Sequence, residues 1–455
     1  MVEFINKYVI GATLPTSLML TGIYFLIRLK FFPIIKAKAV VRHMAKNEKG
    51  AFKALALSLA GTLGVGNIVG VTSAIYAGGF GAIFWMWVSA LVASILKYCE
   101  IVLAMRHRVP SSTGFKGGAP YYIKDCLAPR LPLASGLLSR LFALLCIANC
   151  LSMGAVMQTN AISSALEDAL NIPPLACGIA LAFAAFCLLK GGAMLISRLT
   201  SALVPFMSLF YVVVSLAVIL PRAELLPQML SKILSSAFNF ESALGGFFGF
   251  LTSRALRFGV MRGLFSNEAG CGTSPTAHIS SNSPPCQQGF MGILEVLIDT
   301  VLLCSMTAFT VMLGYEKIEG LGDAPMKMAL AAYSSAFPPA VGKIVECAMA
   351  LMVLCFGFAA ISCLSHYALE CLAFLTKSKR AARIFIPLYS GAVLAGALTS
   401  AAAAWAVSDL TVGVMTLINL GVLLYKRDEI AHETDDFFQK NKNISNFDKK
   451  FTKYS

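Results

Sequence analysis

Charged side chains are scarce in this sequence. They make up 13% of its 455 residues, against 57% hydrophobic residues, whereas a typical soluble domain carries about 25% charged residues. A chain with so little charge cannot cover itself with a surface compatible with water. The composition therefore excludes an ordinary soluble domain and predicts an integral membrane protein.

Several chemical motifs are also missing. The sequence contains no HExxH motif, no GxxxxGK[ST] motif and no Ser-His-Asp constellation, so we expect neither enzyme activity nor a cofactor. The 13 cysteines form no CxxC pairs and lie mostly inside hydrophobic segments, which indicates packing residues without disulfides or bound metal. The basic residues behind the net charge of +14 lie between hydrophobic runs. That distribution is typical of membrane proteins and argues against nucleic-acid binding.

Long apolar runs dominate the chain. A membrane-spanning helix needs about 20 predominantly apolar residues, and eleven segments meet this criterion. They lie near residues 9–29, 51–78, 81–105, 138–166, 175–193, 197–220, 240–282, 287–314, 341–372, 381–405 and 409–425. The seventh is too long for one unbroken span. The sequence after residue 425 is polar, lacks apolar periodicity and is interpreted as a mobile tail.

The charges between these segments predict the orientation of the chain. The connection from Arg28 to Lys53 carries eight basic residues and a single acidic one, whereas the connection after the fourth segment carries Glu167 and Asp168. Basic loops remain on the cytoplasmic side of a membrane. We therefore expect a multi-pass protein of the cell membrane, with its N-terminus outside and its C-terminus in the cytoplasm.

Two of the hydrophobic segments contain glycine-rich interruptions. The second segment reads GTLGVGN at residues 61–67, and the seventh reads RGLFSNEAGCGTSP at residues 262–275. Each glycine weakens a helix by roughly 1 kcal/mol relative to alanine, and irregular backbone survives in a bilayer only where it lines a cavity or is buried in protein. For one motif alone, close helix packing through Gly66 and Gly70 is an equal alternative. Paired interruptions, each in the first helix of a five-helix set, favour a transporter site near the middle of the membrane.

The same motifs resemble the alanine/glycine:cation symporter family, the sodium:alanine symporters. The similar stretches include GTLGVGNIVGVTSAI, GGAPYYI and RGLFSNEAGCGTSPTAH, and the resemblance extends over residues 52–425. It implies an all-α, leucine-transporter-like fold, a five-plus-five inverted repeat preceded by one extra N-terminal helix. We therefore expect the extra helix and a basic cytoplasmic loop at residues 1–50, the two repeats at 51–221 and 222–425, and a cytoplasmic tail at 426–455.

This resemblance also implies a function and a site. Members of the family are secondary transporters that import alanine or glycine with sodium. By analogy, backbone amides of the first interruption hold the substrate carboxylate, while groups of the second interruption and the fourth segment complete the pocket. The residues so implied are Thr62, Gly64, Val65, Gly66, Asn67, Gln158, Ser266, Asn267 and Gly270. The expected partners are a small neutral amino acid and the lipid bilayer, with a monomeric protein.

Ionisable residues inside the predicted spans are further candidates, because a charge in the membrane is costly and is functional by default. Asp299 matches the family in the eighth segment. We expect Glu268, Asp299 and Arg262 to act in gating or coupling. Carboxylates such as Glu268 or Glu100 are candidate gate partners of Arg262, but the sequence does not assign its partner.

Other charges receive a structural interpretation. Lys97 and Glu100 are interpreted as an interfacial group with Arg106 near the end of the third segment. Glu295 lies one helical turn from Asp299 and stands at a position where members of the similar family usually have a small residue. His278 is interpreted as packed or hydrogen-bonded, not as a proton carrier.

The sequence departs from the family at the expected sodium site. Val65 stands where a threonine is common, and Ala359-Ala360 replaces a Ser-Thr pair whose hydroxyls help to coordinate sodium in this fold. Gly61, Ala359 and Ser362 remain the candidate sodium ligands. The alternative function is therefore a cation-independent exchanger or a channel-like permease on the same fold, with a degenerate sodium site.

Overall fold

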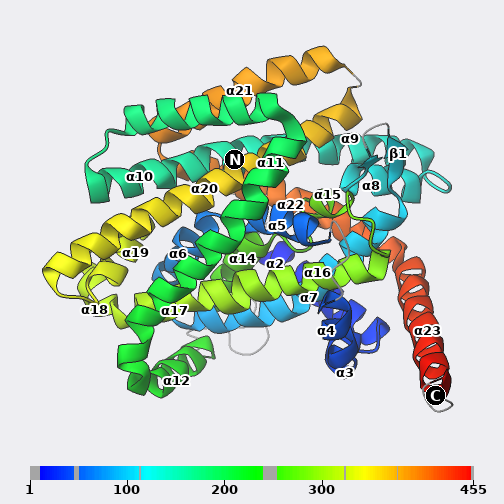
Figure 1. The fold of residues 1–455 in the computed structure, drawn as a ribbon, viewed down its shortest axis with the longest axis horizontal. Helices are drawn as coiled ribbons and strands as arrows, with labels where there is room; N and C mark the ends of the chain where they lie inside the picture. Colours follow the sequence, from blue (N-terminus) through cyan, green and yellow to red (C-terminus); the bar gives the residue numbers. More distant parts are fainter. Residues whose placement is uncertain are drawn as a thin grey trace.

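The structure is a computed structural model that describes residues 11–45, 51–111, 114–238, 254–321, 324–376 and 378–451. The described chain is a bundle of helices (Figure 1), and the all-α prediction is confirmed. Within these residues the one exception is a short antiparallel hairpin of β1 (Val109–Ser111) and β2 (Gly114–Lys116), in which Val109 pairs with Lys116.

The first half of the chain combines long α-helices with shorter 3₁₀ and π-helical segments. Its elements are α2 (Gly11–Arg28), α3 (Phe32–Ile35), α4 (Ala37–Ala45), α5 (Ala51–Thr62), the 3₁₀ turn η2 (Val65–Asn67), α6 (Val69–Gly78), α7 (Gly81–Arg106), α8 (Ala119–Leu127), α9 (Pro132–Asn149), the π-helical η3 (Cys150–Met157), α10 (Gln158–Leu170), α11 (Pro174–Ile219), η4 (Leu220–Leu225) and α12 (Leu226–Ala237). A kink at Gly192, whose φ is 74°, divides α11. This kink separates the fifth and sixth predicted segments.

The second half follows the same pattern of long and interrupted helices. Its elements are α14 (Arg254–Asn267), α15 (Pro275–His278), α16 (Pro285–Val296), the π-helical η5 (Leu297–Cys304), α17 (Ser305–Leu313), α18 (Tyr315–Ile318), η6 (Glu319–Leu321), α19 (Pro325–Ser334), α20 (Pro339–Leu375), α21 (Lys379–Leu398), α22 (Ala401–Tyr425) and α23 (Arg427–Phe451). Part of the seventh predicted segment, residues 239–253, lies outside the described residues.

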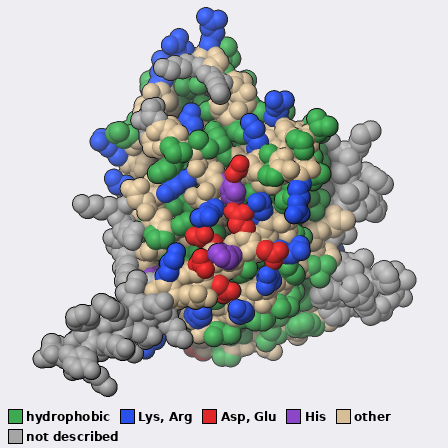
Figure 2. Space-filling model, turned by 90° about the vertical axis from the view of Figure 1, so that its right-hand side faces the viewer, with side chains coloured by type: hydrophobic (Ala, Val, Ile, Leu, Met, Phe, Trp, Pro, Cys, Tyr) green, Lys and Arg blue, Asp and Glu red, His purple; other side chains and the backbone are tan. Residues whose placement is uncertain are grey.

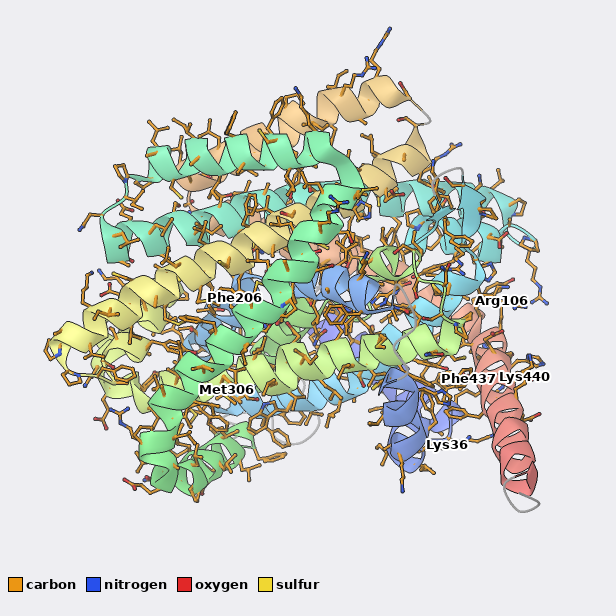
Figure 3. The ribbon with its side chains drawn as sticks, viewed as in Figure 1. Lys36, Arg106, Phe206, Met306, Phe437 and Lys440 are labelled. Atoms are coloured by element: carbon orange, nitrogen blue, oxygen red, sulfur yellow. The ribbon has the colours of Figure 1, made fainter. Side chains whose placement is uncertain are left out.

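Many of these helices are suited to a bilayer. Seven helical stretches of the described chain are long and apolar enough to cross a membrane, or eight if the bent pair α5–α6 counts as one span. Large apolar side chains on the perimeter are exposed, as with Phe206 on α11 at 61% (Figure 3), and they are positioned to face lipid. The membrane prediction is supported, while the exact number of eleven spans stays a prediction.

The interrupted helices occupy the interior. α14 packs against α6 and α7, and α20 packs against α5 and α10, so that both glycine-rich stretches are surrounded by other helices (Figure 1). Every residue from Leu59 to Val71 is buried. The fold therefore places irregular backbone where protein, not lipid, surrounds it, as the bilayer requires.

The predicted mobile tail is wrong in one respect, because residues 427–451 form the helix α23. Its described side chains carry an apolar stripe in which Ile430 and Ala431 are buried and Thr434 hydrogen-bonds Tyr98 at 2.9 Å. Phe437 and Phe438 continue this stripe at helical spacing and contact the rings of His43, Phe32 and Phe290 (Figure 3). The high charge of the segment concealed this periodicity.

Ion pairs fix the same helix to the end of the bundle. His107 lies between Asp125 and Glu429, with 2.8 Å between its Nε2 and the Glu429 carboxylate. Arg28 and Asp428 are 2.7 Å apart. Figure 2 shows this face, on which acidic and histidine side chains gather within a ring of lysines and arginines. Burial alone lowers the pKa of His107, but hydrogen bonds with Cys126, Glu429 and Asp125 raise it to about 10.

These contacts predict a pH-dependent docking of α23. The raised pKa of His107 means that its contribution is complete below the ordinary value of 6.5 and is lost as the pH rises toward about 10. The hydrogen bond with His107 lowers the pKa of Glu429 from 4.5 to about 2, so acid weakens the contact only below pH 4.5. We expect protease cleavage within α23 to accelerate between pH 6.5 and 10. In His107→Gln the cleavage is fast at both ends of this range, whereas the exposed His432→Gln retains the wild-type profile. Equal cleavage at pH 6.5 and 10 in the wild type would contradict this assignment.

Candidate functional site

The first interruption bends its helix sharply. α5 ends at Thr62, the chain passes through Leu63 and Gly64, and η2 leads into α6 at an angle of 59° to α5. The amide of Gly64 bonds the carbonyl of Thr62 instead of continuing the α-helical ladder. The glycine-rich motif therefore produces the break that the sequence predicts.

The second interruption follows α14. Beyond Asn267, three residues take left-handed backbone conformations: Glu268 with φ 51°, Gly270 with φ 95° and Gly272 with φ 81°. Glycine adopts this region without steric cost, which explains two of the three positions. The segment stays irregular until Pro275 begins α15, and it is buried throughout. Helical backbone thus ends inside the protein, and its carbonyls need other partners.

Asp299 joins the two interruptions. Its Oδ1 accepts a hydrogen bond from Asn67 Nδ2 at 2.7 Å, and its Oδ2 accepts from Ser266 Oγ at 2.8 Å and from Thr300 Oγ1 at 2.7 Å. Asn67 belongs to the first break and Ser266 to the second, some two hundred residues away in sequence. All four side chains are at most 1% exposed. The predicted proximity of the two breaks is observed, with this carboxylate between them.

Hydroxyl groups extend this cluster. Asn267 donates to Thr300 Oγ1 at 3.1 Å, and Thr307 Oγ1 donates to the carbonyl of Asn67 at 2.7 Å. Sequence reasoning did not identify Thr300 or Thr307. Thr300 directly follows Asp299 on the π-helical η5, and π-helical turns are frequent at functional sites. The local signal for Thr307 was its position eight residues after Asp299, near the same helix face.

Gln158 covers the first break from the fourth segment. Its Oε1 accepts a hydrogen bond from the amide of Val65 at 3.0 Å. A Cβ added at Gly64 would lie only 3.0 Å from the Gln158 amide and 3.2 Å from Ala360. Glycine is therefore required at position 64 by close approach, whereas a Cβ at Gly66 would meet Phe265 and the backbone of Ser266 at ordinary distances of 3.7 and 3.8 Å.

Two predicted site residues lie apart from the Asp299 cluster. The carbonyl of Gly270 accepts from Asn419 at 2.8 Å, and this glycine faces Leu18 and Leu96. Thr62 Oγ1 donates within its own helix, to the carbonyl of Ser58 at 3.4 Å. The structure therefore brings together Val65, Asn67, Gln158, Ser266 and Asn267 around the two breaks, and it leaves these two groups at the edge.

The candidate sodium ligands lie between α5 and α20. Gly61 faces Cys363 and Tyr367, with 3.1 Å from an added Cβ to the cysteine sulfur. Ser362 Oγ donates to the carbonyl of Phe358 at 2.6 Å, within its own helix. Ala359 is fully buried and brings no side-chain oxygen.

Arg262 pairs with a carboxylate that the sequence did not suggest. Its guanidinium lies 3.8 Å from Asp409 and 3.9 Å from the ring centre of Trp405, not beside Glu268 or Glu100. Arg262 belongs to α14 and Asp409 to α22, and the sequence alone cannot pair positions so far apart. Phe265 packs on Trp405, with 4.6 Å between ring centres. Arg262 and Trp405 both line a cavity of about 530 Å³.

The interfacial interpretation of Lys97 and Glu100 is also wrong, because both side chains are fully buried. The ammonium of Lys97 lies 2.8 Å from Glu295 and donates to the carbonyl of Asn267 at 2.7 Å. Glu100 accepts a hydrogen bond from Asn419, and Arg106 instead faces Glu433 at 3.5 Å. Hydropathy placed these charges near the helix end, but the surrounding helices enclose them.

Comparisons with known proteins agree with this geometry. The family model described as the sodium:alanine symporter family matches residues 1–452. The chain is 32% identical over 455 residues to the sodium/alanine symporter AgcS of Methanococcus maripaludis, covering 97% of this chain and 98% of that protein. It is 33% identical over 426 residues to the probable sodium/glutamine symporter GlnT of Bacillus subtilis, covering 91% and 85% respectively.

A solved structure shares the fold. The substrate-bound, outward-open state of a Na⁺-coupled sialic acid symporter aligns with a TM-score of 0.56 over 93% of this chain and 87% of that one, at 12% sequence identity. At this identity the likeness concerns the fold alone. Together, the family match along the chain and its relatives at over 30% identity show that this protein belongs to the sodium:alanine symporter family, whose members are transporters and not enzymes.

Proposed function

We propose that this protein imports a small neutral amino acid, alanine or glycine, across the cell membrane by alternating access, driven by a cation gradient. The observation that carries the proposal is the buried meeting of two broken helices at Asp299, through Asn67 and Ser266. Paired broken helices are where transporters of this kind bind substrate. The name of the alanine symporter relative supports the choice of substrate.

The proposed site binds the two ends of an amino acid differently. The first break offers backbone amides to the substrate carboxylate, and the amide of Val65, now bound to Gln158, becomes available when that side chain swings away. The second break offers carbonyls and the hydroxyl of Ser266 to the ammonium. The tight approach of Gln158 and Ala360 to Gly64 favours a small side chain.

The architecture proposed for this cycle has eleven spans. One extra helix, α2, precedes two inverted five-helix repeats at residues 51–221 and 222–425, with the N-terminus outside and α23 in the cytoplasm. In this arrangement the cavity that ends on Arg262 and Trp405 is the external vestibule. Arg262, Asp409 and the Phe265–Trp405 stack then form the external gate above the first break.

The coupling cation is the least conventional part of the site. Val65, Ala359 and Ala360 are all buried next to the first break and bring no hydroxyl. We therefore propose that sodium is bound weakly, through backbone carbonyls, at Gly61, Ala359 and Ser362. A cation-independent exchanger is the alternative function. It is kept because Val65, Ala359 and Ala360 bring no hydroxyl to a sodium site.

The first prediction tests the carrier function itself. Purified protein in liposomes loaded with unlabelled alanine is expected to accumulate radiolabelled alanine from outside by counterflow, without any ion gradient. Glycine should compete, whereas a large neutral amino acid such as tryptophan should not. Absence of alanine and glycine counterflow in a correctly folded, monodisperse preparation would contradict the proposed function.

The second prediction concerns Asp299. Asp299→Asn keeps the size of the side chain but removes its charge and half of its acceptor capacity. Because hydrogen bonds to a buried charge contribute about 1.5–3 kcal/mol each, we expect alanine counterflow to fall by about 100-fold. Glu346→Gln, which alters an exposed pair with Lys343, is the matched control and should transport normally. An Asp299→Asn carrier with wild-type rates would rule out the role of this carboxylate in holding the breaks.

The third prediction concerns sodium. Alanine uptake by the unmodified protein should depend weakly on sodium, with a high half-saturating concentration or persistence in its absence. The combined variant Val65→Thr, Ala359→Ser and Ala360→Thr restores three hydroxyls and should lower the half-saturating sodium concentration. Tight, strictly sodium-coupled uptake by the unmodified protein would show that these positions do not form the ion site.

A further inference from the structure

A second buried ionic network lies beside the Asp299 cluster. Lys97 on α7 pairs with Glu295 Oε1 on α16 at 2.8 Å, and His278 Nε2 on α15 lies 3.3 Å from Glu295 Oε2. Gln288 Nε2 then lies 2.6 Å from His278 Nδ1. Lys97, Glu295, His278 and Gln288 are all fully buried. A chain of this kind inside a membrane protein is functional by default.

The charges around this network do not balance. The carboxylates of Glu100, Glu268 and Glu295 all interact with the single ammonium of Lys97. Glu295 also interacts with the carboxylate of Glu268, with His278, with the thiol of Cys363 and with the hydroxyl of Tyr367. With every carboxylate ionised, three negative charges face one positive charge in a buried site, which is costly.

All three of those carboxylates have an oxygen that accepts no hydrogen bond. Among the described residues, Glu100 Oε2 and Glu268 Oε1 are buried without a hydrogen-bond partner, and Glu295 Oε1 has only its ion pair with Lys97. Glu100 otherwise interacts with Asn419 and the backbone of Gly270 and Gly272, and Glu268 binds Thr273 at 2.6 Å. Such orphaned acceptors indicate that the network can take up further positive charge, in the form of a proton or a cation.

His278 can accept that charge without losing a hydrogen bond. When it is neutral, Nε2–H donates to Glu295 and Nδ1 accepts from the Gln288 amide. When Nδ1 is protonated, it becomes a donor, and the amide of Gln288 must turn over to accept. Gln288 Oε1 has no partner within the described structure, so this turn breaks no other bond. The site is therefore satisfied in both protonation states.

We propose that His278, held between Glu295 and Gln288, binds the proton that this carrier moves together with its substrate. The sequence favours a packed or hydrogen-bonded His278. The contacts favour proton binding, because Glu295 and Gln288 can hydrogen-bond the imidazole in both its neutral and its protonated form. A proton from water on one side forms the Nδ1–H bond, and the same bond breaks when the proton leaves on the other side. The proposal rests on the proposed function and adds a proton to the weak sodium coupling proposed there.

Lys97 connects this proton to the substrate site. Its ammonium bonds both Glu295 and the carbonyl of Asn267, the last residue before the second break. A substrate ammonium at the second break competes for that carbonyl, so Lys97 shifts toward Glu295 and changes the field at His278.

The route for the proton leads to a nearby surface. Ser280, two residues after His278, is exposed. Arg108 donates to the carbonyl of Ile279 at 2.9 Å, and this basic connection is cytoplasmic in the proposed topology. His278 thus lies between the second break and the cytoplasmic face, on the release side of the site.

The test uses liposomes in sodium-free buffer, with a trapped pH-sensitive dye and the membrane potential clamped by potassium and valinomycin. Addition of alanine outside is expected to acidify the lumen in the wild type. His278→Gln should lose this acidification while retaining alanine counterflow. His366→Gln, a histidine of α20 outside the network, is the matched control and should acidify like the wild type.

The outcomes separate this inference from the proposed function. Counterflow without lumenal acidification in the wild type would overturn the proton site while leaving the carrier intact. Unchanged acidification in His278→Gln would assign the network a purely structural role and overturn the proposal as well. If His278→Gln does not fold, His278→Asn is measured instead, and unchanged acidification in that variant overturns the proposal.

Discussion

The carboxylate of Asp299 is the interaction on which the rest of the site depends. Breaking a helix inside the protein frees backbone groups that cannot reach water, and this fold does so twice in adjacent places. Asn67 and Ser266, one from each break, donate to opposite oxygens of the same carboxylate. Because these bonds are buried and charge-assisted, they hold the two irregular segments in one relative position. In the proposed function, the small space that Gln158 and Ala360 leave beside Gly64 favours small substrates.

Sequence predicted what is local and missed what is long-range. Glycines at the two breaks were visible as interruptions in apolar runs, and their meeting followed from the expected repeat. The pairing of Arg262 with Asp409 and of Lys97 with Glu295 depends on how helices pack, which no local pattern specifies. Hydropathy also failed where charge and apolar periodicity coincide, so the stripe of α23 through Ile430 and Phe437 was taken for a polar tail.

The ionic groups of the interior lie in two sets on either side of the breaks. Arg262 and Asp409 adjoin a cavity and are 15% and 23% exposed, whereas Lys97 and Glu295 are completely enclosed. An accessible pair is hydrated and can part at modest cost, which suits a gate. An enclosed pair that loses one member leaves an uncompensated charge, which is far more costly. The enclosed set is therefore suited to remain assembled and to exchange only a proton.

Coupling requires that ion and substrate change each other's affinity, and the effect is reciprocal. Lys97 provides such a link, because one ammonium contacts both the carbonyl of Asn267 at the second break and the carboxylate of Glu295 beside His278. In the proposed cycle, displacement of Lys97 by substrate alters the proton affinity of the network, and protonation alters substrate affinity by the same factor. The carbonyl site proposed for sodium has no comparable anchored charge, so the buried lysine is the stronger physical link between ion and substrate.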